Sequence, residues 1–263
     1  MRTSTLIRSS SSSARRGGAR HVISAAVACS VVLAATAACA GPGGHSSHVG
    51  APGVNIPSAS HSPAPKKAPP LPGVGSLMSK RVPARAQQAV VVYGDGRNSD
   101  EGTVVLYQKQ NNAWKIKGSW PAHNGRAGWT TAHRLDDDRS PVGVFSLTDA
   151  GGSLEDPGSH LRYWYDDNAF TSMIDEDVDE DTAHQFDYVI AIDYNRLKGV
   201  PPFDWTRPQG VEKGGGIWLH LDHGDGTSAC VTVPESGMKT LLHTLDPHLH
   251  PVVVMGDRAR LKA

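Results

Sequence analysis

Short apolar runs, separated by turns that contain glycine or asparagine, recur along the chain from residue 87 onward. Residues 89–93, 103–107 and 114–120 form three such runs in succession, and the third alternates cleanly between apolar and polar positions. Runs of this length that are rich in β-branched and aromatic residues are typical of β-strands. The pattern therefore predicts a β-meander at the start of the folded part.

Further elements follow the meander. Residues 140–147 predict a strand that opens next to a proline, residues 188–193 a strand buried on both faces, and residues 250–256 a last strand. Apolar residues at helical spacing after Pro234 predict one short helix. With about eight strands and no long helical pattern, the chain is expected to be mainly β, a mixed β-sandwich or barrel, and not a Rossmann-like sheet.

The stretch 214–233 holds the most chemistry. It has the pattern of two strands joined by a polar, glycine-bearing loop. Alternation with a period of two places Trp218 and His220 on one face of the first strand. If the second strand pairs with the first as a hairpin, Cys230 emerges on the same side as His220. We therefore predict that the thiol and the imidazole lie close together.

A thiol beside an imidazole favours cysteine-dependent acyl transfer. The thiolate is the nucleophile, and it needs a nearby base or a cation that lowers the pKa of the thiol. Cys230 lies at a loop-to-strand junction, where backbone N–H groups can converge to stabilise an oxyanion. The structural alternative is that Cys230 is a small buried hydrophobe.

A metal site is the rival interpretation of the same stretch. It is dense in ligand types, but no second cysteine or distant histidine motif completes a tetrahedral site, so no metal is predicted. The candidate ligands are His220, Asp222, His223, Asp225 and Cys230.

The N-terminal part has the composition of an export signal followed by a tether. Residues 1–39 combine several arginines with a short, alanine-rich apolar run and end in a lipobox-like segment, which makes Cys39 a candidate for lipidation. Residues 40–85 are rich in Gly, Pro, Ser and His and predict a disordered tether. The folded domain is expected over residues 86–263, held outside the cytoplasmic membrane by a lipid anchor or released into the cell wall.

The whole-chain numbers exclude two classes. The chain has 263 residues and a formal net charge of zero, so no electrostatic contact with nucleic acid is expected. Its three cysteines are Cys29, Cys39 and Cys230, and two of them lie in the signal, so no disulfide framework is expected.

Residues 150–187 show no clear periodicity and predict a long irregular insertion, which in a compact domain is often a lid or substrate wall. Its acidic run begins with the spacing of a calcium loop at Asp175, Asp177 and Asp179. No glycine occupies the sixth position of that loop, however, and Phe186 occupies the twelfth, so a solvated acidic loop is the expectation.

Two short motifs lie far apart in the chain: Ser-Pro-Val-Gly-Val-Phe at residues 140–145, and Ile-Trp-Leu-His at 217–220 followed by Thr227-Ser-Ala-Cys230 and a Pro-Glu helix. The first resembles the Thr-Pro-x-Gly-x-Phe strand, and the second the catalytic signature, of the YkuD-type L,D-transpeptidases. The resemblance spans about residues 87–256. It implies a YkuD-type fold, a thioester on Cys230, His220 as the base, and an oxyanion held by the N–H groups of Ala229 and Cys230. It also implies peptidoglycan stem peptides as substrates, carbapenem-type β-lactams as inhibitors, and no cofactor.

The motif departs from the family at two positions. Ser228 stands where the family has histidine, and Ala229 where it has glycine, a change that can strain the backbone before the nucleophile. His223 is the candidate replacement for the missing histidine. Asp222, Asp193 or a backbone carbonyl is left open as the group that orients His220. Thr227 is expected to support the turn, and the candidate substrate contacts are Tyr163, Tyr165, Trp218 and Asn195.

Three alternatives remain open. The acyl group can pass to water, which would make the chain an L,D-carboxypeptidase. Papain-like and NlpC/P60-like peptidases are disfavoured, because they carry the cysteine on a helix and ahead of the histidine. A non-catalytic, wall-binding lipoprotein that keeps the scaffold is the third alternative.

Overall fold

The computed structural model describes residues 69–174 and 177–263. The expected signal, Cys39 and its lipidation, the histidines of the tether, and Asp175 of the calcium-like spacing lie outside the described residues. No helix in the described part is long and apolar enough to cross a membrane.

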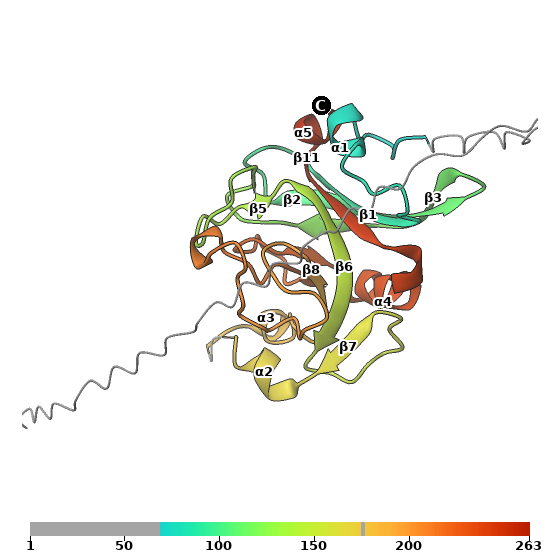
Figure 1. Cartoon of the computed structure of the whole chain (residues 1–263). Coiled ribbons are helices and arrows are strands. Elements are labelled where there is room, and N and C mark those ends of the chain that lie inside the picture. Colours follow the sequence, from blue (N-terminus) through green and yellow to red (C-terminus); the bar gives the residue numbers. More distant parts are fainter. Residues whose placement is uncertain (1–68, 175–176) are drawn as a thin grey trace, which may run out of the picture. The chain divides into compact units, whose positions relative to one another are not determined.

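Nine of the strands form one mixed sheet in the order β10-β9-β8-β6-β11-β1-β2-β3, with β7 pairing to β6 (Figure 1). The two end strands of this order, β10 and β3, contact each other, and the N–H of His123 donates to Thr232 Oγ1 at 3.1 Å between them. The sheet is therefore nearly closed, and the expected mainly β fold, a mixed barrel or sandwich, is confirmed. The strands of the structure are β1 (Gln88–Gly94), β2 (Glu101–Gln110), β3 (Ala113–His123), β4 (Trp129–Thr130), β5 (Ser140–Pro141), β6 (Gly143–Gly152), β7 (Arg162–Tyr165), β8 (Val189–Ile192), β9 (Trp218–Leu221), β10 (Val231–Val233) and β11 (Val252–Asp257).

The expected meander is present as β1, β2 and β3, which pair antiparallel in sequence order. The run expected at 140–147 is split at Val142, because β5 pairs with β4 whereas β6 pairs with β11. Pro141 has no N–H to donate and ends β5, and β6 then continues to Gly152. As a result β6 runs through the middle of the sheet and reaches both regions discussed below.

The helices are short. The expected helix after the cysteine strand is α4, whose Met238, Leu241 and Leu242 are fully buried. In α2 and α3 the side chains of Asp166 and Asp179 cap the helix by accepting from the N–H groups of Ala169 and Thr182. The helices are α1 (Ser76–Ser79), α2 (Asp167–Thr171), α3 (Glu180–Ala183), α4 (Glu235–Thr244) and α5 (Arg258–Lys262), with 3-10 turns η1 (Val211–Lys213) and η2 (Pro247–Leu249).

The prediction of a β9–β10 hairpin is wrong. The two strands pair in parallel, with Thr232 opposite His220. The loop between them turns back along residues 124–126, where Thr227 receives and donates backbone hydrogen bonds, and the chain then re-enters in the original direction. A parallel pair needs such a crossover, whereas a hairpin does not.

The predicted boundary between the tether and the folded domain, at residue 85, lies too far toward the C-terminus. Leu71, Val74 and Met78 are buried in the core, and α1 lies beside α5 (Figure 1). Three apolar residues in this proline- and glycine-rich stretch suffice to anchor it, so ordered structure begins about fifteen residues before the predicted boundary.

The insertion at 150–187 is not irregular throughout, because β7, α2 and α3 lie in it. Phe170 and Phe186 of the insertion pack edge-to-face on Trp218 of β9. The insertion therefore covers the face of β9 that carries Trp218.

Candidate functional site: a thiol and an imidazole on neighbouring strands

His220 lies in β9, and Cys230 directly precedes β10, the strand that pairs in parallel with β9. Thr232 is opposite His220 in the register, and Cys230 lies two residues before Thr232, so its side chain points to the same side. Diagonal neighbours of this kind have Cα atoms about 7–8 Å apart, within reach of an imidazole ring. The parallel pairing thus directs both side chains to one side of the sheet, and the hydrogen bonds of the Cys230 sulfur run to Gly216 and Trp218 at the start of β9.

The Cys230 sulfur is held by backbone groups at the start of β9. It accepts the N–H of Trp218 at 3.3 Å and donates to the carbonyl of Gly216 at 3.8 Å. Burial raises the pKa of the Cys230 thiol to about 11, and the Trp218 N–H only partly offsets this. The expectation of a thiol with a lowered pKa is therefore not met, and at neutral pH the thiol is protonated.

His220 is almost completely enclosed, with 2% of its surface exposed. Its ring meets Phe186 edge-on at 5.2 Å and stacks with His223 at 5.8 Å. Burial, followed by the charge of His223, lowers the pKa of His220 to about 3, while the backbone carbonyls of Leu221 and Gln185 act in the opposite direction. His220 is therefore neutral across the physiological range, and its burial disfavours the protonated ring.

A backbone carbonyl orients His220. Nδ1 lies 3.0 Å from the carbonyl oxygen of Leu221, and since a carbonyl only accepts, the proton of the neutral ring sits on Nδ1. The two carboxylates considered from the sequence are engaged elsewhere. Asp222 Oδ1 accepts from Thr232 Oγ1 at 2.6 Å and contacts His123 Nδ1 at 2.8 Å, and Asp193 pairs with Arg196.

Two side-chain hydroxyl groups hold the turn before Cys230 by donating hydrogen bonds to its backbone carbonyls. Ser140 Oγ donates to the carbonyl of Ala229 at 2.7 Å, and Thr227 Oγ1 donates to the carbonyl of Cys230 at 2.8 Å. Because the peptide unit is planar and trans, pinning the Ala229 carbonyl fixes the Cys230 N–H in the opposite direction. Within the described residues the N–H groups of Ser228, Ala229 and Cys230 donate to no protein acceptor. The Cys230 N–H is therefore an unpaired donor of fixed direction, as an oxyanion site requires.

The two departures from the family motif have different consequences. Ala229 is not among the residues with positive φ, so the alanine introduces no left-handed strain before the cysteine. Ser228 is exposed and makes no hydrogen bond to a described residue. His223, the candidate replacement for the missing histidine, stacks with His220.

The four candidate substrate contacts have different environments. Asn195 is buried, and its amide is fully used, since it donates to the carbonyls of Gly210 and Gly214 and accepts from the Gln209 N–H. Trp218 is buried beside Cys230, and its Nε1 has no partner among the described residues. Tyr163 donates to the carbonyl of Leu154, whereas Tyr165 is mostly exposed.

Acidic residues of the insertion lie close to this face. The pKa of Asp179 is lowered, first by the N–H and hydroxyl of Thr182 and also by the nearby His223. The carbonyl of Gln185 accepts from the Leu221 N–H at 3.1 Å, which ties the segment after α3 to β9. The end of the acidic run is thus placed beside the His220–His223 pair.

Some contributors to the site were not identified from the sequence. Ser140 was assigned only to a strand, and Gly216 only to a loop, because a contact made by a backbone carbonyl leaves no trace in residue type. Phe186 was considered only as a poor calcium ligand, whereas its ring meets that of His220 edge-on. The family-like Ser140-Pro141 motif was the one signal that pointed to Ser140.

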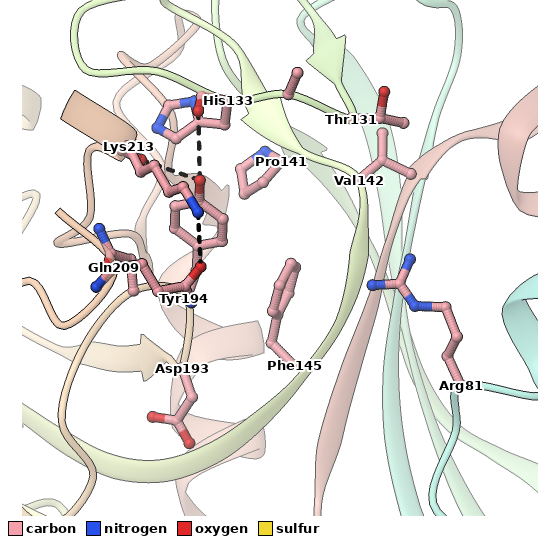
Figure 2. Close-up of a pocket in the computed structure, with 12 residues that line it drawn as sticks. Arg81, Thr131, His133, Pro141, Val142, Phe145, Asp193, Tyr194, Gln209 and Lys213 are labelled. Atoms are coloured by element: carbon pink, nitrogen blue, oxygen red, sulfur yellow. Dashed lines mark hydrogen bonds between the residues drawn. The ribbon is translucent and has the colours of Figure 1, made fainter.

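A separate hollow of about 370 Å³ lies beside β6, between Arg81 on one side and Tyr194 and Lys213 on the other (Figure 2). Neither Cys230 nor His220 lines it. Among residues 69–174 and 177–263, no group of three or more His, Cys, Asp and Glu side chains could hold a metal ion.

No family model matches the chain, and no curated protein matches it. The chain is similar to a solved structure from Bdellovibrio bacteriovorus, described as the structure of Bd1075, with a TM-score of 0.36 and 17% sequence identity. The match covers 65% of this chain and 48% of that one, so the chain spans about half of its length. A likeness at this level carries no inference about fold or function.

Proposed function

We propose that this protein is a cysteine-dependent acyltransferase that acts on the stem peptides of peptidoglycan, as an L,D-transpeptidase does. The observation that carries the proposal is the placement of Cys230 and His220 on one face of neighbouring strands, beside the unpaired N–H groups of residues 228–230. The motifs around Ser140 and Cys230 support the choice of substrate. Export, and lipidation of Cys39, are part of the same proposal.

The proposed chemistry begins from a neutral pair. The Cys230 sulfur attacks the carbonyl carbon of the diamino acid at position three of the stem, and its proton passes to Nε2 of His220 as the S–C bond forms. The carbonyl oxygen becomes an oxyanion held by the N–H groups of Ala229 and Cys230. Collapse breaks the amide bond, the terminal D-residue leaves with the proton from His220, and a thioester remains.

The second half-reaction transfers the acyl group to an amine of a neighbouring stem. The amine attacks the thioester carbon, loses a proton to His220, and releases the Cys230 thiol as the new amide forms. The acidic end of the insertion beside His223 favours an approaching ammonium group over an anion, which supports an amine acceptor. Transfer to water, giving a shortened stem, is the competing outcome.

The test is incubation with a disaccharide-tetrapeptide, followed by mass analysis. A cross-linked dimer is expected from the wild type, a tripeptide without dimer would indicate transfer to water, and neither product from Cys230→Ala is expected. Acylation by a carbapenem is the second readout, and the adduct should map to the peptide that contains Cys230. A folded wild-type protein that gives neither product nor adduct would overturn the proposal in favour of a non-catalytic, wall-binding protein.

A further inference from the structure

A second region of the molecule gathers positive charge around two connected hollows. One is the hollow of about 370 Å³ beside β6, and the other, of about 420 Å³, lies further along the same strand. Arg81 and Phe145 line both of them, so the two form one groove, called here the β6 groove. Lys213 and Tyr194 line its first half, and Arg85 and Lys198 its second half.

The basic residues of the β6 groove are presented on fixed backbone. Arg81 and Arg85 lie between two buried anchors, Met78 and Ala86, and hydrogen bonds within residues 78–86 hold the segment between them. Both arginines are exposed, and among the described residues no carboxylate pairs with them or with Lys213. Three cations on a net-neutral chain are therefore left uncompensated along one groove.

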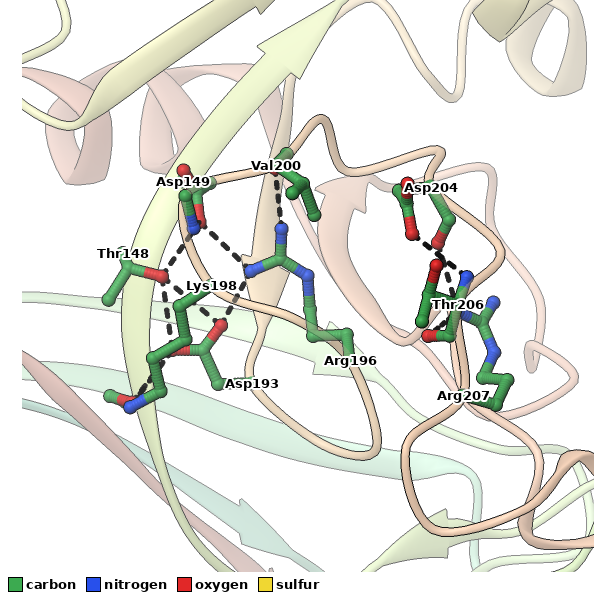
Figure 3. Close-up of polar contacts among 11 residues, drawn as sticks. Thr148, Asp149, Asp193, Arg196, Lys198, Val200, Asp204, Thr206 and Arg207 are labelled. Atoms are coloured by element: carbon green, nitrogen blue, oxygen red, sulfur yellow. Dashed lines mark hydrogen bonds and ion pairs between the residues drawn. The ribbon is translucent and has the colours of Figure 1, made fainter. Parts of the chain in front are cut away.

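The carboxylates beside the β6 groove are paired with cations of the same chain. Asp193, which lines it, and Asp149 both pair with the guanidinium of Arg196, at 2.6 and 3.0 Å (Figure 3). All three side chains are 1–2% exposed, and Ser146 and Thr148 donate further hydrogen bonds to Asp193. Lys198 adds a second cation 3.7 Å from Asp193. These two carboxylates are thus balanced by two cations and do not repel an anionic ligand.

The surface between the cations is apolar. Phe145 and Tyr194 meet edge-to-face at 5.6 Å in the first half, and Val144 and Val252 line the second half. A ligand that follows the groove meets positive charge and apolar surface in alternation. A peptide with acidic groups separated by small apolar side chains matches this pattern, whereas a uniformly hydrophilic phosphodiester chain does not.

We propose that the β6 groove binds an extended acidic peptide, with its carboxylates on Arg81, Arg85 and Lys213. The proposal is independent of the chemistry at Cys230, because neither Cys230 nor His220 lines the groove. Arg81 is the central contact, since it reaches both halves. The guanidinium of each arginine can take a carboxylate through two parallel hydrogen bonds.

The test uses the full chain and three probes: an alternating glutamate–alanine peptide, the matching glutamine–alanine peptide, and inorganic polyphosphate. Binding is followed by calorimetry and by amide shifts of residues 144–148 in NMR spectra. We expect the glutamate peptide to bind and to shift these amides, and its affinity to fall as the salt concentration rises. The glutamine peptide should bind at least about tenfold more weakly.

Charge reversal provides the matched variants. The Arg81→Glu/Arg85→Glu double variant should lose about tenfold or more in affinity, and Lys213→Glu alone should lose less. Lys115→Glu/Lys117→Glu makes the same charge change on exposed residues of β3 and should leave binding unchanged. Cys230→Ala should also bind normally, which separates this proposal from the proposed function.

Four outcomes would overturn the proposal. In the first, the glutamate peptide does not bind. In the second, the Arg81→Glu/Arg85→Glu variant binds it as well as the wild type does. In the third, polyphosphate binds and the acidic peptide does not. The fourth is salt-sensitive self-association of the wild type that the double variant abolishes, with no peptide binding, because the occupant would then be a second copy of the chain.

Discussion

The face of the sheet that carries Cys230 and His220, called here the thiol face, and the β6 groove differ in both exposure and charge. At the thiol face the reactive groups are enclosed, uncharged and held by backbone contacts, with acidic side chains of the insertion nearby. In the β6 groove the useful groups are exposed, charged and held by the backbone on which they sit. One sheet can therefore keep an enclosed thiol apart from a charged surface.

The two regions share one connecting segment, residues 193–216. Its first residue, Asp193, lines the groove, and its last, Gly216, contacts the Cys230 sulfur through its carbonyl. Between them Asn195 ties the segment together through the carbonyls of Gly210 and Gly214. The two regions thus lie at the two ends of one segment, so variants can be chosen that alter one region or the other.

The largest effect is expected from His220→Gln. The substitution removes the base and should lower acyl transfer about 10²–10⁴-fold. Product formation from the disaccharide-tetrapeptide measures this loss. Binding of the glutamate–alanine peptide serves as the control and should not change, because His220 does not line the groove. Loss of both would show that the two regions are not separable.

Arg196→Met should lower the stability of the fold next to the β6 groove. It leaves Asp149 and Asp193 buried without their cation, and breaking a buried pair in this way costs about 3–5 kcal/mol of unfolding free energy. Urea denaturation followed by tryptophan fluorescence measures the loss. Lys198→Met is the matched control: the side chain is 59% exposed, so a loss below about 1 kcal/mol is expected, together with weaker peptide binding.

The two regions also differ in how much of them the sequence predicts. Alternation at β9 and the position of Cys230 were sufficient to select His220 and Cys230, because side-chain direction follows from period two whatever the pairing. The direction of pairing was not predictable, since it depends on bonds between Thr227 and residues 124–126. The β6 groove was missed altogether. Arg81 and Arg85 lie in a stretch expected to be disordered, and only the burial of Leu71 and Met78 places them against β6.

Acidification should separate the enclosed imidazole from the exposed cations. Burial lowers the pKa of His220 from 6.5 to about 3, so the folded state favours the neutral ring. The free energy of unfolding therefore has its full value above pH 6.5. It falls by about 1.4 kcal/mol per pH unit as the pH decreases toward 3, because the unfolded state binds the proton that the folded state does not.

The measurement is urea denaturation at neutral pH and at about pH 4.5, where His220 should lower the free energy of unfolding by roughly 2–3 kcal/mol. His220→Gln should remove this part of the pH dependence. The control is His243→Gln, which alters an exposed histidine of α4 and should leave the pH dependence unchanged. If the free energy of unfolding changed with pH equally in the wild type and in His220→Gln, the ring of His220 would not be held neutral by the fold.

The smallest effect is expected at the acidic end of the insertion. Asp179→Asn removes the charge beside His223 but keeps an N-cap for α3, since asparagine caps as well as aspartate. If this charge attracts the acceptor ammonium, the ratio of dimer to tripeptide should fall about two- to threefold at low salt and less at high salt. Asp246→Asn makes the same change at the cap of η2 and should leave the ratio unchanged. An unchanged ratio in Asp179→Asn would mean that the acidic segment covers β9 without selecting the acceptor. The charge contrast between the two regions would then matter only at the β6 groove.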